Sequence, residues 1–322
     1  MRIYGGNSGS AGATFDLGTN NGKLYNRNGS LTVQLGALAG GPGTVLTGAS
    51  TYNNPTTNII GGNNLDSVFN GQITDSTGVS MIIKLGTGTL TLNGICTNTG
   101  TTTISNGTLQ VNGSLYTNSV TVAGGTLAGI GVLNGPVSVF AGGTIAPGTN
   151  NATTGTLTVS NNLTLAAGSV SSFGLGTNSD RIVVKGNLAL GGTLNVTNFG
   201  GLVAGTNTLF TYTGALSGSL AMGVLPPGFK YLLATNVPGQ VNLLAFKPVI
   251  TTTAMVSTNL VFTGSGGIAS SNYYVLTSTN LALSLTNWTR ALTNQFDALG
   301  NFRATNGITA GNPRQFYLVQ IP

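Results

Sequence analysis

Short stretches of the chain alternate strictly between apolar and small polar residues. In the segment 89–92, Thr-Leu-Thr-Leu, the leucines fall on one face of an extended strand and the threonines on the other. A similar phrase, glycine followed by threonine and leucine or isoleucine, begins at Gly88, Gly107, Gly125 and Gly143, with spacings of 19, 18 and 18 residues. A fixed period near ~20 residues predicts a solenoid in which each repeat forms one coil.

Tight turns separate the predicted strands. The pairs Asn106-Gly107 and Asn112-Gly113 each follow an alternating stretch, and such pairs accommodate positive φ and turn the chain sharply. Strands of about four to five residues joined by these turns fit a coil of roughly 18–20 residues. The chain is therefore predicted to be all-β, with a β-solenoid (parallel β-helix) over residues 1–175.

Stacking of the coils accounts for the composition. A single coil cannot bury its leucines alone, so successive coils lie ~4.8 Å apart, pair their backbones and place like residue over like residue. Charged side chains in such columns would repel their own copies, whereas threonine, asparagine and serine tolerate them. Only 5% of the residues are charged, against roughly 25% in an average soluble protein.

The distribution of charged, apolar and cysteine residues argues against several kinds of function and site. The formal charge of +6 is scattered, with no basic run, so no nucleic-acid partner is expected. No apolar run reaches the roughly 18 residues of a membrane helix, so no membrane span is expected. The single cysteine, Cys96, cannot form an intrachain disulfide or a cysteine zinc site. It is predicted to be a small buried apolar side chain.

The repeat loosens from about residue 171. Residues 176–247 are predicted to close the open end of the solenoid, because an uncovered end would expose unpaired strand edges. Residues 248–254, Pro-Val-Ile-Thr-Thr-Thr-Ala, are expected to form a linker.

A different style of sequence follows the expected linker. Residues 255–322 contain the only tryptophan, Trp288. Strand-like runs occupy residues 259–262, 273–277, 288–292, 302–304 and 315–321. This number of strands predicts a C-terminal β-sandwich-like module over residues 255–322.

The stretch 86–113 resembles a known family, the autotransporter-associated β-strand repeat, also called the passenger-associated transport repeat. The residues that match its pattern are Gly88 to Leu92, Gly94, Thr97, Thr99, Gly100, Thr102 to Ile104 and Gly107 to Leu109. Cys96 and Asn98 depart from it, since the family usually has asparagine and an aromatic residue there. The resemblance implies a secreted or surface-displayed bacterial β-helix. Residues 273–322 resemble a C-terminal module of large extracellular β-rich bacterial proteins.

Candidates for catalysis are few, because the chain contains no histidine and no glutamate. Asp66 and Asp75 are the nearest approach to a two-carboxylate glycosidase site. Their separation of half a coil predicts that they face different sides and serve as turn and cap residues. Asp180 and Arg181 are adjacent, so their side chains point to opposite faces of a strand, and a turn position is favoured.

Other candidate sites are equally weak. The stretch 61–66, Gly-Gly-Asn-Asn-Leu-Asp, approaches a calcium-binding repeat but occurs once. Tyr273, Tyr274 and Trp288 either line a sugar groove or pack in a core, and packing is favoured. We therefore expect no catalytic residues, no cofactor-binding residues, no metal ligands and no cofactor.

The sequence favours an extracellular or cell-surface structural protein that associates with itself into a fibre, stalk or matrix, because low charge removes the repulsion between chains. The uncharged N-terminal stretch is a candidate for a strand donated to a neighbour. Two alternatives are a polysaccharide-binding adhesin, with a cell-surface polysaccharide as its partner, and a β-helix polysaccharide lyase or hydrolase. The first residues lack the apolar region of a secretory signal, so we expect a processed or truncated start.

Overall fold

The computed structural model describes residues 1–4, 8–27, 31–51, 53–149, 153–308, 311 and 314–322. The chain divides into two compact units. The first comprises Met1–Leu202, Thr208–Pro226 and Thr235–Asn242, and the second comprises Val203–Asn207, Pro227–Ala234 and Leu243–Pro322.

Parallel strands on three faces build the first unit. The first face runs in the order β2 (Ser8–Asp16), β4 (Leu31–Ala39), β6 (Thr56–Ile60), β9 (Ser80–Lys84), β12 (Thr102–Ile104), β15 (Val120–Val122), β18 (Val137–Val139), β21 (Leu163–Leu165), β24 (Leu188–Leu190) and β27 (Leu216–Gly218). The second runs in the order β7 (Ser67–Phe69), β10 (Thr89–Leu92), β13 (Thr108–Val111), β16 (Thr126–Gly129), β19 (Thr144–Pro147), β22 (Val170–Leu175), β25 (Thr193–Asn198) and β28 (Ala221–Met222).

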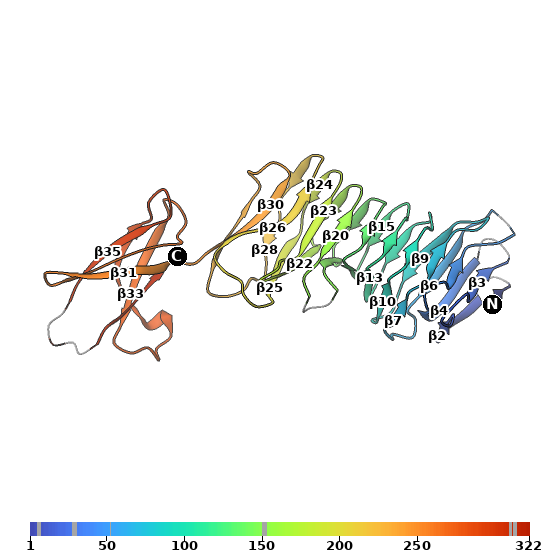
Figure 1. Ribbon diagram of the computed structural model, residues 1–322, viewed down its shortest axis with the longest axis horizontal. Helices are drawn as coiled ribbons and strands as arrows, with labels where there is room; N and C mark the ends of the chain where they lie inside the picture. The colour runs from blue at the N-terminus through green and yellow to red at the C-terminus, as the bar shows by residue number, and fades with distance from the viewer. Residues whose placement is uncertain (5–7, 28–30, 52, 150–152, 309–310, 312–313) are drawn as a thin grey trace. The chain divides into compact units, whose positions relative to one another are not determined.

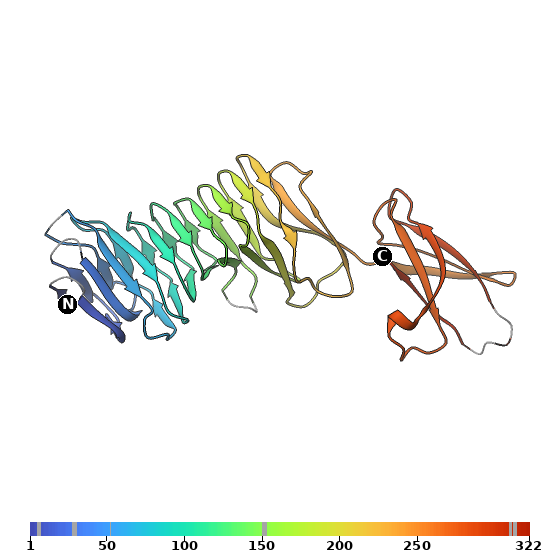
Figure 2. The same ribbon diagram turned by 180° about the vertical axis from the view of Figure 1, so that it is seen from behind.

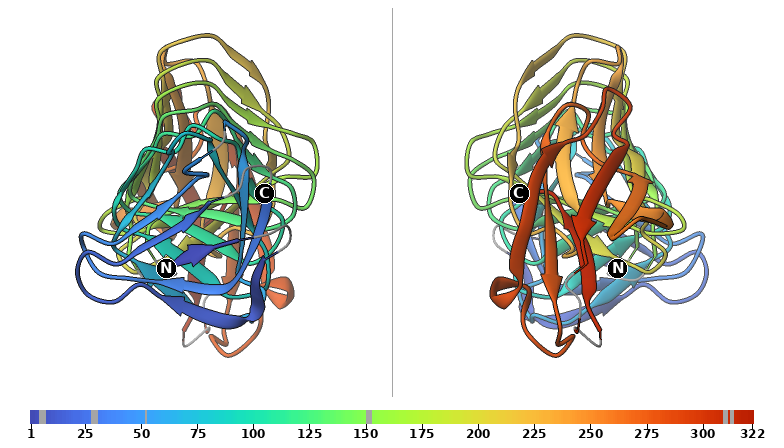
Figure 3. Two further views of the ribbon diagram at one scale, coloured as in Figure 1. Left: turned by 90° about the vertical axis from the view of Figure 1, so that its right-hand side faces the viewer. Right: turned by 90° about the vertical axis from the view of Figure 1, so that its left-hand side faces the viewer.

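The third face consists of two sheets. One is ordered β1 (Arg2–Ile3), β3 (Lys23–Asn26), β5 (Val45–Thr47) and β8 (Gln72–Thr74). The other begins β11 (Ile95–Cys96), β14 (Ser114–Leu115), β17 (Val132–Leu133), β20 (Thr156–Val159), β23 (Arg181–Val184) and β26 (Gly205–Tyr212). Figures 1 and 2 show the strands of successive coils side by side, and in Figure 3 the coils lie behind one another with a progressive shift. The predicted parallel β-helix is confirmed.

The coils extend beyond residue 175, where the predicted solenoid ended. Strand β22 pairs in parallel with β25 from Val170 opposite Thr193 to Leu175 opposite Asn198, and β25 pairs with β28. Strand β22 lacks the repeated phrase, since it carries Ser171, Ser172 and a large Phe173 in place of alternating leucine and threonine. Strand β25 keeps it, because Gly192 is followed by Thr-Leu-Asn-Val. Strands β29 (Lys230–Ala234) and β30 (Gln240–Phe246) follow β28 along the chain.

The register of the second face places the repeated residues over one another. The inward column consists of Leu90, Leu109, Leu127 and Ile145, each paired with the next and at most 1% exposed. The outward column consists of Thr89, Thr108, Thr126 and Thr144. The expectation of leucine over leucine and threonine over threonine is confirmed, and burial of the leucine column provides the hydrophobic stabilisation of the stack.

Two glycines of the predicted turns are required for different reasons. Gly107 has φ of 61°, a left-handed conformation that glycine adopts without strain. Gly113 does not have a positive φ. A Cβ atom on Gly113 would lie 2.0 Å from the carbonyl oxygen of Gly94 in the neighbouring coil, so this position requires glycine because the backbones approach closely.

Asparagine side chains form a hydrogen-bonded ladder beside these turns. Asn93 Nδ2 donates to Asn70 Oδ1 at 2.7 Å, and Asn112 Nδ2 donates to Asn93 Oδ1 at 2.9 Å. The ladder ends at Asn112, whose buried Oδ1 has no hydrogen-bond partner among the described residues. In the next coil Ile130 takes the position that asparagine holds in the ladder. Each asparagine amide can therefore donate a hydrogen bond to the asparagine of one neighbouring coil and accept one from the other, as long as the sequence repeats.

Lys84 is a cation inside the solenoid. It occupies an inward column between Ile60 and Ile104 and is 1% exposed. Its Nζ donates to the carbonyl oxygens of Leu85 at 2.6 Å, Gly86 at 3.1 Å and Asn106 at 3.4 Å. Burial lowers the pKa of Lys84 to about 8, opposed by the nearby carboxylate of Asp66. The ammonium group is tolerated because turn carbonyls satisfy its donors.

Antiparallel sheets form the second unit. One is ordered β31 (Val249–Val256), β32 (Asn259–Ser265) and β35 (Phe302–Gly307), and the other β34 (Thr289–Gln295), β33 (Asn272–Ser278) and β36 (Phe316–Gln320). A 3-10 turn, η1 (Leu285–Asn287), precedes β34. The core draws Phe262 and Phe302 from one sheet and Tyr273 and Val275 from the other, together with Phe296. This arrangement is that of a small β-sandwich.

The segment 248–254, expected to be a linker, lies almost entirely within strand β31. All of the β31 side chains except Ile250 are exposed. A strand that is exposed on both faces has no apolar–polar alternation, so the sequence carries no period-2 signal there.

Removing one leucine from the inward column tests the stacking. Leu109→Ala is expected to lower the free energy of unfolding by about 2–5 kcal/mol, because it leaves a cavity between Leu90 and Leu127. Gln110→Ala, on the outward side of the same strand, is expected to change it by less than about 0.5 kcal/mol. Urea unfolding followed by circular dichroism measures both. Equal effects of the two substitutions would contradict the assignment of inward and outward columns.

Candidate functional site

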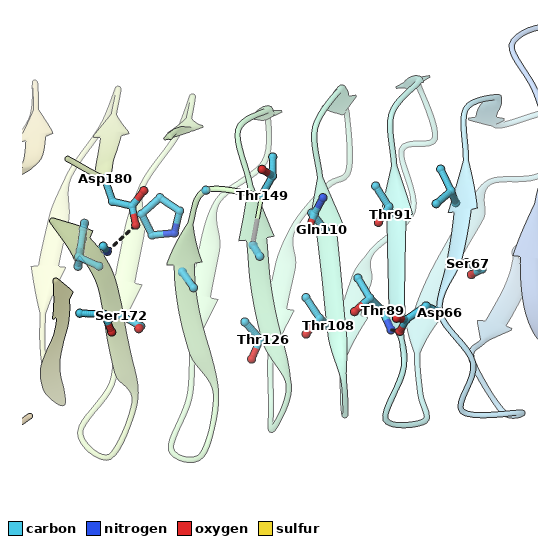
Figure 4. Close-up of a pocket in the computed structure, with 18 of the residues that line it drawn as sticks. Asp66, Ser67, Thr89, Thr91, Thr108, Gln110, Thr126, Thr149, Ser172 and Asp180 are labelled. Atoms are coloured by element: carbon cyan, nitrogen blue, oxygen red, sulfur yellow. Dashed lines mark hydrogen bonds between the residues drawn. The ribbon is translucent and has the colours of Figure 1, made fainter. Parts of the chain in front are cut away.

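A groove follows the outward surface of the second face of the solenoid. Its volume is about 950 Å³, and its floor is formed by β7, β10, β13, β16, β19 and β22. Figure 4 shows Ser67, Thr89, Thr108 and Thr126 on successive strands, with their side chains on the groove side. The groove therefore exists because the coils stack in register, which aligns outward side chains along the solenoid axis.

Hydroxyl and amide groups line this floor. One column contains Thr89, Thr108 and Thr126, and the neighbouring column contains Thr91 and Gln110. These outward side chains are half-buried. Successive coils repeat the hydrogen-bonding groups every ~4.8 Å. The second column continues from Gln110 to Ala128 and Ala146 in the following coils. The floor is therefore more apolar at β16 and β19 than at β10 and β13.

Two carboxylates lie at opposite ends of the groove, as Figure 4 shows. Asp66 immediately precedes β7, and Asp180 binds the backbone of β22. These strands are five positions apart in the sheet, a separation of about 24 Å between the strands. Among the described residues that line the groove, none is lysine or arginine. The groove is thus uncharged along its length, with an acidic group at each end.

Asp180 joins two segments at its end of the groove. Its Oδ1 accepts a hydrogen bond from Gly155 N at 2.7 Å, and its Oδ2 accepts one from Gly174 N at 2.6 Å. The residue is 2% exposed. Burial raises the pKa of Asp180 to about 6, although the two backbone donors act in the opposite direction. Asp180 therefore holds the chain before β20 against the end of β22.

Phe199 provides an aromatic surface at the same end. It is half-buried, and its ring packs on Gly174, where a Cβ atom would lie 1.8 Å from the ring carbon Cε2. Phe173, on the neighbouring position of β22, points into the solenoid and packs edge to face with Phe210 at 5.1 Å between ring centroids. Glycine at position 174 thus allows Phe199 to lie across the strand and to close one end of the groove.

The acidic residues singled out from the sequence bind backbone donors. Asp66 Oδ1 accepts a hydrogen bond from Thr89 N at 2.6 Å. Asp75 accepts from Ser80 N at 2.7 Å and from Thr99 N at 2.9 Å. Asp75 follows β8 on the third face, and the structure does not bring it into the groove with Asp66.

Other candidates also occupy structural positions. Arg181 is exposed while its neighbour Asp180 is buried. In the stretch 61–66, Asn64 Oδ1 accepts a hydrogen bond from Thr87 N of the next coil at 3.0 Å. Cys96 is buried, and burial raises the pKa of its thiol to about 11.

The aromatic residues of the second unit do not form one surface. Tyr273 is fully buried and its hydroxyl donates to Arg303 O at 2.9 Å. Tyr274 is half-buried and carries the Arg290 guanidinium over its ring at 4.3 Å. Trp288 is half-buried, and its Nε1 donates to Leu283 O at 3.2 Å.

The sequence did not identify the groove or its aromatic end. The outward threonines were visible in the pattern, but Phe199 directly follows β25, at a position that the repeated phrase does not include. Within the described part of the chain, no three His, Cys, Asp or Glu side chains are grouped so that they could hold a metal ion. None of the helical structure described is long and apolar enough to cross a membrane.

Comparison with known proteins agrees with the coil geometry. Residues 82–111 match the family model of the passenger-associated-transport-repeat. The repeat begins within β9 and ends with β13, so it supplies two floor strands of the groove, β10 and β13, and the register between them. The matched segment thus runs from β9 through one coil and includes the first two strands of the next coil, β12 and β13.

The chain is also similar to a curated autotransporter protein. It is 45% identical over 117 residues to an adhesin BmaC autotransporter of Brucella suis biovar 1 (strain 1330). The similar region makes up 33% of this chain and 3% of that protein, so this chain spans only a small part of the length of that relative.

The buried carboxyl group of Asp180 predicts a dependence of stability on pH. The pKa of about 6 in the folded chain lies above the ~3.9 of an unfolded aspartate, so the folded state binds the proton more tightly. Ionisation of Asp180 therefore costs stability as the pH rises from about 4 to above 6. We expect its contribution to raise the free energy of unfolding by about 1–3 kcal/mol between pH 7 and pH 4.5.

Urea unfolding at both pH values, with Asp180→Asn as the comparison, measures this effect. The asparagine cannot ionise, so the difference between the two proteins isolates Asp180 from the other aspartates. The same change with pH in both proteins would show that Asp180 is not the group responsible.

Proposed function

We propose that this chain is a surface-exposed part of a bacterial adhesin passenger, and that the groove of its solenoid binds an uncharged polysaccharide. The observation that carries the proposal is the continuous uncharged row of hydrogen-bonding side chains along the groove. The 45% identity over 117 residues to an autotransporter adhesin supports the surface location and the adhesive role. The passenger-associated transport repeat supports the same class of protein.

The chemistry of the groove favours a neutral glycan. Threonine hydroxyls and the Gln110 amide can both donate and accept hydrogen bonds, as sugar hydroxyls do. The spacing of ~4.8 Å between coils is similar to the length of one hexose unit in an extended chain. The Phe199 ring offers an apolar face to a sugar ring. An acidic polysaccharide would find no lining lysine or arginine to neutralise it, and Asp66 at one end would repel it.

Binding without cleavage is favoured over a lyase or hydrolase. Glycosidases place two carboxyl groups roughly 5–10 Å apart across the scissile bond. The two carboxylates of the groove lie beside strands β7 and β22, which are about 24 Å apart in the sheet. A single sugar linkage therefore cannot contact both of them.

A second function, association of the chain with itself into a fibre or matrix, is favoured by a separate observation. Charged residues are 5% of the sequence, and strand β31 has an uncharged, exposed edge. Proteins with little charge lack the repulsion that keeps molecules apart in solution. In this function the solenoid is a spacer, and contacts between copies give the assembly its strength.

A binding experiment tests the groove. The purified chain is titrated with soluble neutral polysaccharides, a glucan and a mannan, and with an acidic polysaccharide, polygalacturonate. We expect binding of a neutral polymer and no binding of the acidic one. Thr108→Arg places a long cation in the middle of the floor and is expected to weaken binding at least about tenfold, a change of about 1.4 kcal/mol.

Thr121→Arg is the matched control for Thr108→Arg. Thr121 lies at an outward position of β15, on the first face of the solenoid, and its substitution is expected to leave binding unchanged. Equal binding by both variants, or preference for the acidic polymer, would overturn the groove as the binding site.

A further inference from the structure

The groove and a smaller cavity of the solenoid share one aromatic residue. Phe199, which is half-buried, lines both of them. The smaller cavity has a volume of about 350 Å³. Its other lining side chains carry hydroxyl or amide groups, and they are Thr153, Thr154, Thr177 and Asn178. An aromatic ring beside a few convergent polar groups is the usual composition of a small-molecule subsite.

A pair of hydroxyl groups also joins the two cavities. Thr149 lines the groove and Thr153 lines the smaller cavity, and their Oγ1 atoms are hydrogen-bonded at 2.6 Å. One hydroxyl hydrogen is used between the two oxygens. The other hydroxyl can therefore donate to a ligand, and both oxygens can accept further hydrogen bonds. Figure 4 shows Thr149 towards the same end of the groove as Asp180.

The segment that carries Thr153 is fixed against the groove by backbone contacts. Asp180 Oδ1 accepts a hydrogen bond from Gly155 N at 2.7 Å, two residues after Thr153. A Cβ atom on Gly148 would lie 2.5 Å from the carbonyl oxygen of Thr153, so the chain passes very close to itself here. The hydroxyl pair is thus held in place before any ligand binds, which reduces the entropic cost of binding.

The floor of the groove selects the shape of a polymer. Thr89, Thr108 and Thr126 lie in register on successive strands, so their hydroxyl groups follow a line along the solenoid. A polysaccharide that bonds to this row must be extended. β-1,4-Linked glucose forms an extended chain, whereas α-1,4-linked glucose curls into a helix that departs from such a line.

Phe199 and the hydroxyl pair select the sugar ring. In β-linked glucose the hydroxyl groups are equatorial and surround the edge of the ring, while both faces present C–H groups. One such unit can therefore stack a face on an aromatic ring and offer its edge to hydroxyl side chains. Phe199 supplies the aromatic ring, and Thr149 and Thr153 supply the hydroxyl groups.

We propose that Phe199, Thr149 and Thr153 form a subsite for one unit of an extended β-1,4-linked glucan, whose neighbouring units lie along the threonine floor. This inference rests on the proposed binding of a neutral polysaccharide, and it names the sugar and the linkage of that polymer. Asp180 is a positioning residue in this subsite, because its two carboxylate oxygens bind the backbone of Gly155 and Gly174.

Two oligosaccharides of glucose that differ only in linkage test the subsite. The full chain is titrated by calorimetry with cellohexaose, which is β-1,4-linked, and with maltohexaose, which is α-1,4-linked. Cellohexaose is expected to bind at least about tenfold more tightly. Phe199→Leu keeps an apolar side chain over Gly174 but removes the flat ring, and it is expected to weaken cellohexaose binding about fivefold. Phe199→Tyr keeps the ring and is expected to keep the affinity.

Matched controls separate the subsite from the rest of the solenoid. Phe140→Leu is the control for Phe199→Leu, because Phe140 is 50% exposed and follows β18 on the first face. Thr149→Val covers the case in which Phe199→Leu misfolds, since it removes one hydroxyl without changing the shape of the side chain. It is expected to weaken cellohexaose binding at least about threefold, whereas Thr121→Val on the first face is expected to have no effect.

The outcomes separate this inference from the proposed function. Equal affinity for cellohexaose and maltohexaose, or unchanged binding in both Phe199→Leu and Thr149→Val, would overturn the subsite. If Thr108→Arg still weakened the binding of a neutral polymer in that case, the groove would remain the binding site. A chain that binds no neutral polysaccharide would overturn both. Preference for the β-linkage together with loss of affinity in Phe199→Leu is the result expected from the subsite.

Discussion

Parallel backbone pairing between successive coils is the constraint on which the rest of this structure depends. In-register pairing places every side chain directly over its counterpart in the next coil, as Leu90, Leu109 and Leu127 show. Each position must then tolerate its own copy ~4.8 Å away. Leucine does so by packing and asparagine by the amide ladder from Asn70 to Asn112. The low content of charge follows, and the cation inside the stack, Lys84, is held by the carbonyls of a turn.

The same constraint shapes the groove. Outward residues are aligned as strictly as inward ones, so a row of threonines is a by-product of stacking as well as a surface for binding. The features that distinguish this face from a plain sheet arise where the repeat fails. Asp66, Asp180 and Phe199 lie at the ends of the row, and none of them repeats in the coil beside it. The repeat of the coils therefore gives the groove its length. Departures from the repeat determine where the groove ends and where negative charge lies along it.

The sequence predicts those parts of the fold that repeat and misses those that do not. The phrase at Gly88 and Gly107 predicts strands β10 and β13, their inward leucines and their parallel register. Its interruption in β22 hides the further coils, because backbone pairing continues from Val170 to Leu175 through serines and Phe173, which do not match the phrase. Strand β31 is missed for a related reason, since exposed threonines carry no periodic signal. The position of Phe199 depends on its contact with Gly174. The two residues are far apart in the sequence, so no local pattern predicts this contact.

The two units meet the problem of unpaired strand edges in opposite ways. In the solenoid each coil covers the edge of the one before it, and uncharged side chains make that covering possible. The second unit follows the same composition in β31, but among the described residues no further strand pairs with its second edge. A charge at that edge would have protected it, yet the strand carries none. The property that permits stacking within one chain, side chains that accept a neighbouring copy of themselves, is the property that favours pairing between two chains. Stacking inside the molecule and association between molecules thus have a common physical origin.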